Sequence, residues 1–161
     1  MKKLFLIYAS VILTSVLLLA ACGDDDKDFV VKNQTVSECK SISPTAPIYR
    51  RANGLYGEQE TVVVTASTDG FIKLSHNNAQ FACDCEKVEY KVAIDDNKIV
   101  VVELPDGGAA NCFCPMDASC EIGPLEVGAT YQLQLANASG NRIVDVEFVY
   151  NTNINVETTI Q

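Results

Sequence analysis

The stretch that most constrains the fold is residues 112–131, CFCPMDASCEIGPLEVGATY, which holds three of the seven cysteines of this 161-residue chain. From its last residue onward the chain alternates, with Tyr131, Leu133 and Leu135 on one side and polar residues between them. A period of two is typical of a β-strand that buries one face. We therefore interpret the stretch as a passage from a loop into a strand that closes a small β-sandwich.

Leu125, Gly128 and Tyr131 have the spacing of a tyrosine corner and resemble that feature of immunoglobulin-like and fibronectin type III-like sandwiches. In those domains the tyrosine ring packs in the core and its hydroxyl bonds the backbone a few residues upstream. The chain has no Trp, and Leu133 stands where an antibody domain would place a disulfide cysteine. The resemblance implies an all-β fold, an immunoglobulin-like antiparallel β-sandwich with Greek-key connections. The alternative is an ordinary turn followed by a strand.

Between positions 60 and 150, short apolar or alternating runs are separated by turn residues at the regular intervals typical of a β-sandwich, and they predict further strands. The expected strands are residues 60–67, 71–75, 87–94, 99–104, 130–137 and 142–150. Thr68-Asp69-Gly70 predicts a hairpin, because glycine readily adopts the positive φ that such turns need. The nearly apolar run 99–104 favours a central strand covered on both faces. We expect a first strand to begin at Phe29, and the tail 151–161 to form an edge strand or to fray.

The N-terminus has the pattern of a secretory signal, with Lys2 and Lys3 before an apolar run at residues 4–18. Leu19-Ala20-Ala21-Cys22 resembles the bacterial lipobox, which implies cleavage before Cys22, a lipid on its sulfur and acylation of its new amino group. Several acyl chains anchor a protein durably to a membrane. The alternative is an uncleaved membrane helix. The expected organisation is a lipoprotein signal peptide at 1–21, the lipidated cysteine and an acidic tether at 22–28, and a single β-sandwich domain at 29–161.

The tether GDDDKD at residues 23–28 is similar to the surface-export signal of Bacteroidales lipoproteins. This similarity implies an outer-membrane protein, lipid-anchored and exposed at the cell surface, although a solvated spacer would have the same composition. The chain has a formal net charge of −9. Nucleic-acid binding needs a basic surface, so we expect no nucleic-acid partner.

With Cys22 assigned to lipid, six cysteines remain, and an even number in an exported chain predicts disulfides. We hypothesise a crosswise pairing between the two Cys-x-Cys pairs, with Cys39 bonded to Cys120. One unbroken strand over residues 81–94 would place Cys83 and Cys85 on the same face as the solvent-facing Lys87 and Glu89. We therefore expect either a turn or bulge near Glu86, or a surface loop that carries these cysteines. The disulfide candidates are Cys39, Cys83, Cys85, Cys112, Cys114 and Cys120.

A metal site is a competing interpretation, because thiolates with Met116 and His76 nearby in sequence would suit Cu(I) or Zn. Structural zinc sites favour Cys-x₂-Cys spacing, which is absent here, and the chain has one histidine. We expect His76, beside Asn77 and Asn78, to be a turn residue. No phosphate loop, Gly-x-Ser-x-Gly or His-Glu-x-x-His motif occurs. The prediction is therefore no enzyme, no catalytic residues, no metal and no cofactor.

The lipobox, the acidic tether and the cysteine motifs together resemble a group of small Bacteroidales surface lipoproteins. The motifs are Phe81-x-Cys83-x-Cys85 and Cys112-x-Cys114-Pro115-x-Asp117, followed by the strand at Tyr131. We expect a membrane-anchored, non-enzymatic binding module whose ligand is a glycan, a protein or an outer-membrane complex. The alternatives are an envelope Cu/Zn or redox protein that uses the Cys-x-Cys pairs, and a protease inhibitor that presents a rigid loop at residues 105–111.

Overall fold

The fold is seen in a computed structural model, which describes residues 29–40, 49–50, 56–57, 59–68 and 70–160. The predicted signal peptide, Cys22 and the acidic tether lie outside these ranges. The described residues contain strands and no helix, so no helix among them could span a membrane. The strands are β1 Val30–Val36, β2 Tyr49–Arg50, β3 Tyr56–Gly57, β4 Thr61–Ala66, β5 Ile72–Ala82, β6 Val88–Asp95, β7 Lys98–Pro105, β8 Phe113–Gly123, β9 Thr130–Ala136, β10 Arg142–Val149 and β11 Asn155–Thr159.

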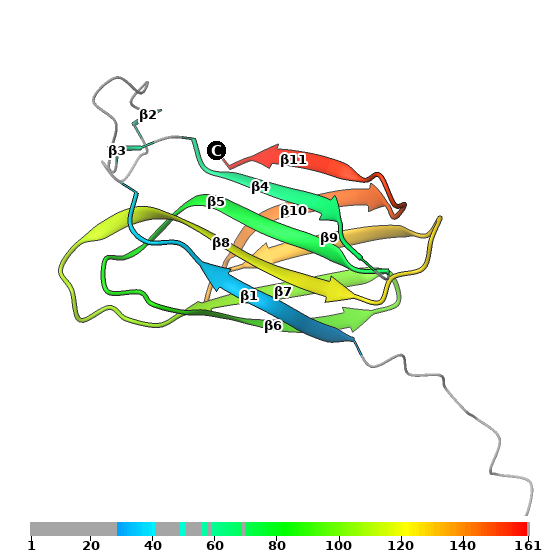
Figure 1. Ribbon diagram of the computed structural model, residues 1–161, viewed down its shortest axis with the longest axis horizontal. Helices are drawn as coiled ribbons and strands as arrows, with labels where there is room; N and C mark the ends of the chain where they lie inside the picture. The colour runs from blue at the N-terminus through cyan, green and yellow to red at the C-terminus, as the bar shows by residue number, and fades with distance from the viewer. Residues whose placement is uncertain (1–28, 41–48, 51–55, 58, 69, 161) are drawn as a thin grey trace, which may run out of the picture.

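Two sheets face each other as the layers of a sandwich (Figure 1). Within the described residues, the first sheet has the order β1-β8-β5-β4-β11 and the second has the order β10-β9-β7-β6. A short third ladder pairs β2 with β3. The edge strands β1 and β6 are tied together where the backbone N–H of Tyr90 donates to Gln34 Oε1 at 2.9 Å. The prediction of an all-β fold of two sheets is confirmed.

One pairing departs from the expected antiparallel arrangement. β7 and β9 run parallel, with Ile99 opposite Leu133 and Val101 opposite Leu135. The other pairs of neighbouring strands in the described residues are antiparallel. Parallel neighbours need a crossover connection. Here the chain leaves β7, forms β8 in the opposite sheet, and returns to the second sheet as β9.

The core lies between the sheets and follows the predicted alternation. On β9, Tyr131, Leu133 and Leu135 are buried, whereas Thr130 and Gln132 are exposed. The prediction for residues 99–104 was wrong in one respect. β7 is central in its sheet, but only its inward residues are fully buried, and the outward Val100, Val102 and Leu104 are half-buried. A continuous apolar run therefore does not mark a strand covered on both faces here.

β5 and β8 are longer than the sequence suggested, since each has 11 residues. The expected strand at residues 71–75 continues to Ala82, and most of the cysteine-rich stretch forms β8 instead of a loop. A β-bulge interrupts the pairing between His76 and Ala79. An extra residue in one strand reverses the side-chain parity. The inward residues are even-numbered before the bulge and odd-numbered after it, so a search for strict alternation stops at Ser75.

The hairpin predicted at residues 68–70 forms, and a second hairpin joins β9 to β10. Gly70 has φ +84° between β4 and β5, and Gly140 has φ +77° between β9 and β10. Asp69, in the first of these turns, lies outside the described residues. β1 begins one residue after Phe29, and the C-terminal tail forms the edge strand β11 on β4.

Candidate functional site

Three ionisable side chains meet in the interior of the sandwich. His76 Nδ1 lies 2.8 Å from Glu103 Oε2, and His76 Nε2 lies 2.7 Å from Glu60 Oε1. The three residues are between 1% and 7% exposed, so the contacts are shielded from solvent. Glu60 precedes β4, His76 is on β5 and Glu103 is on β7, so this Glu–His–Glu cluster links the two sheets.

The two hydrogen bonds of the cluster require two protons. An imidazolium ring donates from both nitrogens to two carboxylates, whereas a neutral ring donates once and accepts once from a protonated carboxyl group. Either arrangement leaves one net negative charge on the three groups. A low-dielectric interior strengthens such bonds and also makes the loss of one partner expensive.

The β-strand pattern places these side chains inward. Glu103 has the parity of Ile99 and Val101, which are both fully buried. His76 has the parity of Ile72 and Leu74, so the prediction that it is a turn residue was wrong. The bulge that follows turns Phe81 to the same side, and its ring centroid lies 6.3 Å from that of His76 in an edge-to-face contact.

A pocket of about 310 Å³ opens onto the cluster at one end of the sandwich. Its walls are mainly apolar and come from β5, the end of β7 and the β9–β10 turn, and the cluster contributes polar groups. The lining residues are Glu60, His76, Ala79, Gln80, Phe81, Glu103, Pro105, Asn137, Ala138, Ser139 and Ile143.

Burial governs the ionisation of the groups around the cluster. Tyr90 lies opposite Glu103 in the β6–β7 ladder, and burial, followed by the Glu103 charge, raises the pKa of Tyr90. Burial and then Glu103 also raise the pKa of Cys120. Burial and then a hydrogen bond with Asp106 raise the pKa of Cys85. Both thiols therefore stay protonated at neutral pH and are poor nucleophiles.

The structure forms two disulfides in the described part of the chain, Cys39–Cys114 and Cys83–Cys112. Of the hypothesised crosswise bonds between the two Cys-x-Cys motifs, only one forms, Cys83–Cys112, because Cys114 bonds Cys39 instead. The pairing of Cys39 with Cys120 was wrong, and so was the inclusion of Cys85 and Cys120 among disulfide residues. Both of these are buried free cysteines.

The direction of β8 explains the difference. Cys120 points into the core with no exposed surface, and it pairs opposite Leu74 of β5. Cys114 lies six residues earlier, about 20 Å away along an extended strand. The segment after β1 runs beside the start of β8, so Cys39 lies beside Cys114 and far from Cys120. Cys83 lies in a turn that separates it from Cys85, which is the interruption near Glu86 that the sequence required.

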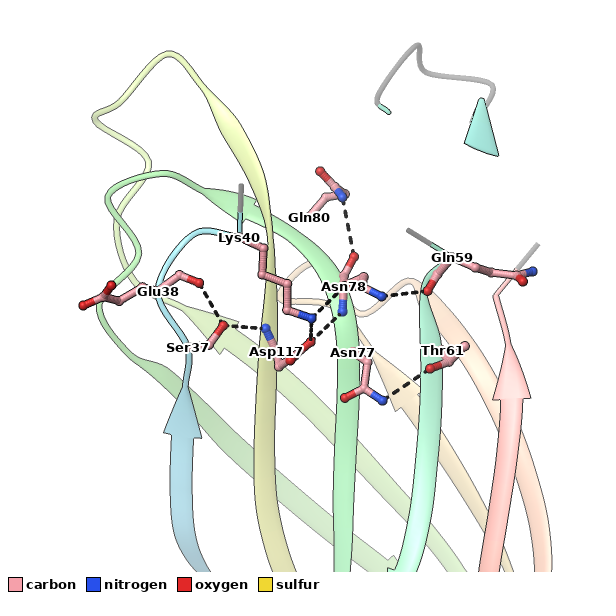
Figure 2. Close-up of polar contacts among 9 residues, drawn as sticks. All are labelled: Ser37, Glu38, Lys40, Gln59, Thr61, Asn77, Asn78, Gln80 and Asp117. Carbon is pink, nitrogen blue, oxygen red and sulfur yellow. Dashed lines mark hydrogen bonds and ion pairs between the residues drawn. The ribbon is translucent and has the colours of Figure 1, made fainter. Parts of the chain in front are cut away.

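A polar network fixes the segment that carries Cys39 (Figure 2). The backbone N–H of Ser37 donates to Asp117 O, and the N–H of Asp117 donates to Ser37 Oγ. Lys40 Nζ donates to Asp117 Oδ1 and to Asn78 Oδ1. Asn78 occupies the bulge with φ +57° and donates its N–H to Asp117 Oδ1 at 3.0 Å. Asp117 is thus the centre of a network that joins β1, β5 and β8.

Tyr131 makes the contact that a tyrosine corner requires. Its hydroxyl accepts a hydrogen bond from the backbone N–H of Glu126 at 3.0 Å, and the residue is 4% exposed. Gly128, between them, has φ +85°, and Leu125 is buried. The ring of Tyr131 packs on Phe148 with centroids 5.8 Å apart.

The Glu–His–Glu cluster holds the His76 ring in one orientation between two carboxyl groups. Both nitrogens of His76 are occupied by carboxyl groups, so the ring has no free nitrogen to accept a proton from a substrate. The three sequence-separated residues were missed because no motif joins them. One signal was available in the sequence, because Glu103 falls on the same face of its strand as the apolar Ile99 and Val101. A carboxyl group on that buried face needs a hydrogen-bonding partner.

Comparison of the chain with family models, with curated proteins and with solved structures found no match.

Proposed function

We propose that the chain is a lipid-anchored protein of the cell envelope, attached through Cys22 to the outer membrane and exposed at the cell surface. The basic start, the apolar run and Leu19-Ala20-Ala21-Cys22 support this proposal. Metabolic labelling with a fatty acid tests it, because the chain should take up label and Cys22→Ala should abolish the uptake. Unchanged labelling of the variant would exclude anchoring at Cys22.

We further propose that the sandwich is a non-enzymatic binding module related to immunoglobulin-like domains. The Tyr131 contact and the two-sheet architecture support the relationship, and the parallel β7–β9 pair distinguishes this connectivity from an all-antiparallel arrangement. The occupied nitrogens of His76 and the protonated thiols support a role in binding, because neither supplies an activated base or nucleophile.

The observation that carries this proposal is a polar depression of about 430 Å³ on the outer face of the four-stranded sheet. Strand register places its side chains in rows. Glu147, Gln132 and Lys98 lie side by side across β10, β9 and β7, and Asp145 lies beside Gln134 in the next row. The lining residues are Lys98, Gln132, Leu133, Gln134, Arg142, Asp145, Val146 and Glu147.

The chemistry of these side chains favours a hydroxyl-rich ligand, which we take to be a glycan. Each glutamine amide offers two donors and a carbonyl acceptor, matching hydroxyl groups that both donate and accept. Carboxylates and cations alternate nearby, with Gln132 Nε2 donating to Glu147 at 3.3 Å and Arg142 donating to Asp145 at 2.8 Å. Because the lining has no aromatic ring, affinity would rest on hydrogen bonds and be modest, on the order of 0.1–1 mM for one site.

The conformation of the loop at residues 105–111 does not favour the alternative function, a protease inhibitor. Gly107 and Gly108 have φ +82° and +104°, so the backbone departs from the extended conformation at both residues. The N–H groups of Gly108, Ala109 and Ala110 point at the Asp84 carboxylate. The loop therefore lacks the extended backbone that would pair with an enzyme cleft.

A glycan array probed with the full chain tests the binding proposal. We expect selective binding that Gln132→Ala and Gln134→Ala weaken at least 10-fold, because each removes amide contacts at the centre of the depression. Gln80→Ala, which removes a glutamine from the other sheet, is the matched control and should bind like the wild type. Glycan binding that Gln132→Ala and Gln134→Ala leave unchanged would contradict the proposal. So would a chain that binds a protein but no glycan.

A further inference from the structure

Four cysteines from three separate segments converge at one end of the sandwich. The Sγ atoms of Cys39, Cys83 and Cys114 all lie within 4.8 Å of one another. Cys112 joins them through its bond to Cys83. In the part of the chain that the structure describes, this is the one group of three or more His, Cys, Asp or Glu side chains whose ligand atoms gather so closely. We call these four residues the four-cysteine cluster.

Non-covalent contacts place Cys39 independently of its disulfide. The reciprocal Ser37–Asp117 bonds lie on one side of it, and the N–H of Lys40 donates to Pro115 O at 2.9 Å on the other. The Lys40 ammonium group is held by Asp117 and Asn78 (Figure 2). The backbone at Cys39 is thus fixed on both sides against the start of β8.

Similar contacts place the remaining three cysteines. The N–H of Cys83 donates to Cys112 O at 3.1 Å, which joins the β5–β6 turn to the β7–β8 loop. The Asp84 carboxylate accepts three N–H bonds from the β7–β8 loop, and the Asp106 carboxylate accepts two from residues 86 and 87. Cys114 pairs opposite Phe81 in the β5–β8 ladder. Opening the disulfides would therefore leave four thiols still gathered in one place.

We propose that the reduced four-cysteine cluster is a closed, four-thiolate binding site for Zn²⁺. Zinc prefers four thiolates at about 2.3 Å in a tetrahedron, which corresponds to sulfur–sulfur distances of about 3.8 Å. The sulfurs of Cys39, Cys83 and Cys114 already lie within 4.8 Å of one another. Zinc binding therefore requires the bonded sulfurs to separate and Cys112 to move into the group. The Cys-x₂-Cys motif is unnecessary, because three segments supply the ligands. Cys85, Cys120 and His76 are excluded, because they lie in the core with other contacts.

The redox step balances with an external reductant. Each disulfide is reduced to two thiols either by a dithiol, which gives up two electrons and two protons and becomes a disulfide itself, or by a phosphine. The phosphine gives up two electrons and becomes a phosphine oxide, and water supplies the oxygen of that oxide and the two thiol protons. Zn²⁺ then displaces the four thiol protons and forms four Zn–S bonds. The cluster thus has two stable forms, with two disulfides under oxidising conditions and one bound ion under reducing conditions. This proposal is independent of the glycan site, which lies on β7, β9 and β10.

Cobalt titration of the full chain, reduced with a phosphine under anaerobic conditions, tests the site. We expect one Co²⁺ per chain with the intense visible absorption of a tetrahedral thiolate complex, and its displacement by one equivalent of Zn²⁺. Cys39→Ser and Cys83→Ser, which each remove a ligand from a different segment, should lose this spectrum. The Cys85→Ala/Cys120→Ala double variant is the matched control and should retain it.

Circular dichroism separates loss of the site from loss of the fold. The reduced chain and both ligand variants should keep the β-sheet signal, because the contacts around each cysteine remain. A folded, reduced wild-type chain that shows no tetrahedral cobalt spectrum would overturn the proposal. A spectrum that survives Cys83→Ser, or that disappears in the Cys85→Ala/Cys120→Ala variant, would overturn it as well. A reduced chain that unfolds and is not refolded by Zn²⁺ would do the same.

Discussion

At the scale of single residues, the Glu–His–Glu cluster is the most demanding feature of the core. Burying charged groups carries a large desolvation cost, and the cost is offset only when every group has well-aligned partners. His76 satisfies this condition with contacts of 2.7 and 2.8 Å to two carboxyl groups. The cluster therefore joins the inward faces of β5 and β7 through the paired nitrogens of His76.

Replacing Glu103 with alanine should destabilise the fold by about 3–5 kcal/mol, because it removes one of the two carboxyl partners of the buried His76 ring. Glu103→Gln should cost less, since the amide keeps an acceptor oxygen and the side-chain volume. Urea unfolding followed by circular dichroism measures both. Glu157→Ala, on the exposed face of β11, is the control and should change stability by less than about 0.5 kcal/mol. Equal effects of Glu103→Ala and Glu157→Ala would refute a structural role for the cluster.

Tyr131→Phe should destabilise the fold by about 1 kcal/mol, because it removes the acceptor of the Glu126 N–H and keeps the ring packing. Thermal unfolding is a suitable measurement. Tyr150→Phe is the matched control, since Tyr150 is a second buried tyrosine whose hydroxyl makes no hydrogen bond to the described residues. If Tyr131→Phe is as stable as the wild type, the hydroxyl contact does not hold this corner.

At the scale of elements, alternation predicts a strand only while parity holds. Residues 87–94 and 130–137 alternate without interruption, and they form β6 and β9 close to the expected bounds. β5 changes parity at the bulge of Asn77 and Asn78, so its second half looked like a turn. β8 keeps its parity, with Met116, Ala118, Cys120 and Ile122 inward, but its cysteines and Pro115 suggested a loop. Glu60, His76 and Glu103 come from three elements, so their meeting depends on strand order, which no local pattern encodes.

The β5–β6 turn and the β7–β8 loop are held together by reciprocal carboxylates. Backbone hydrogen bonds, first that of Gly108, lower the pKa of Asp84, and those of Lys87 and then Glu86 lower the pKa of Asp106. A carboxyl group with a lower pKa in the folded state contributes stability above its unfolded pKa. That contribution is lost as the pH falls through the folded pKa.

Asp84→Asn should therefore lower the Tm at pH 7, because one amide oxygen cannot accept the three N–H bonds that two carboxylate oxygens accept. The difference from the wild type should shrink as the pH falls below the ordinary value of 3.8, where the wild-type carboxyl group also becomes protonated. Differential scanning calorimetry across this range gives both curves. Asp145→Asn, on the solvent face of β10, should give no comparable closing of the gap. A constant Tm difference at all pH values would argue against the carboxylate's role.

At the scale of the whole molecule, β1 runs along the sandwich from one end to the other. Its first residue, Val30, pairs opposite Gly123, and the segment after it reaches Pro115 beside the four-cysteine cluster. The N-terminal end of β1 and the cluster are therefore at opposite ends of the sandwich (Figure 1). Under the proposed anchoring through Cys22, the chain would therefore enter the domain at the end opposite the cluster.

The central claim is that four particular cysteines gather at one end of a two-sheet sandwich while two others stay in its core. Peptide mass spectrometry of the oxidised chain, with free thiols alkylated under denaturing conditions before proteolysis, measures this directly. We predict Cys39 linked to Cys114, Cys83 linked to Cys112, and alkylation of Cys85 and Cys120. A Cys39–Cys120 link, or any disulfide that includes Cys85, would contradict the account.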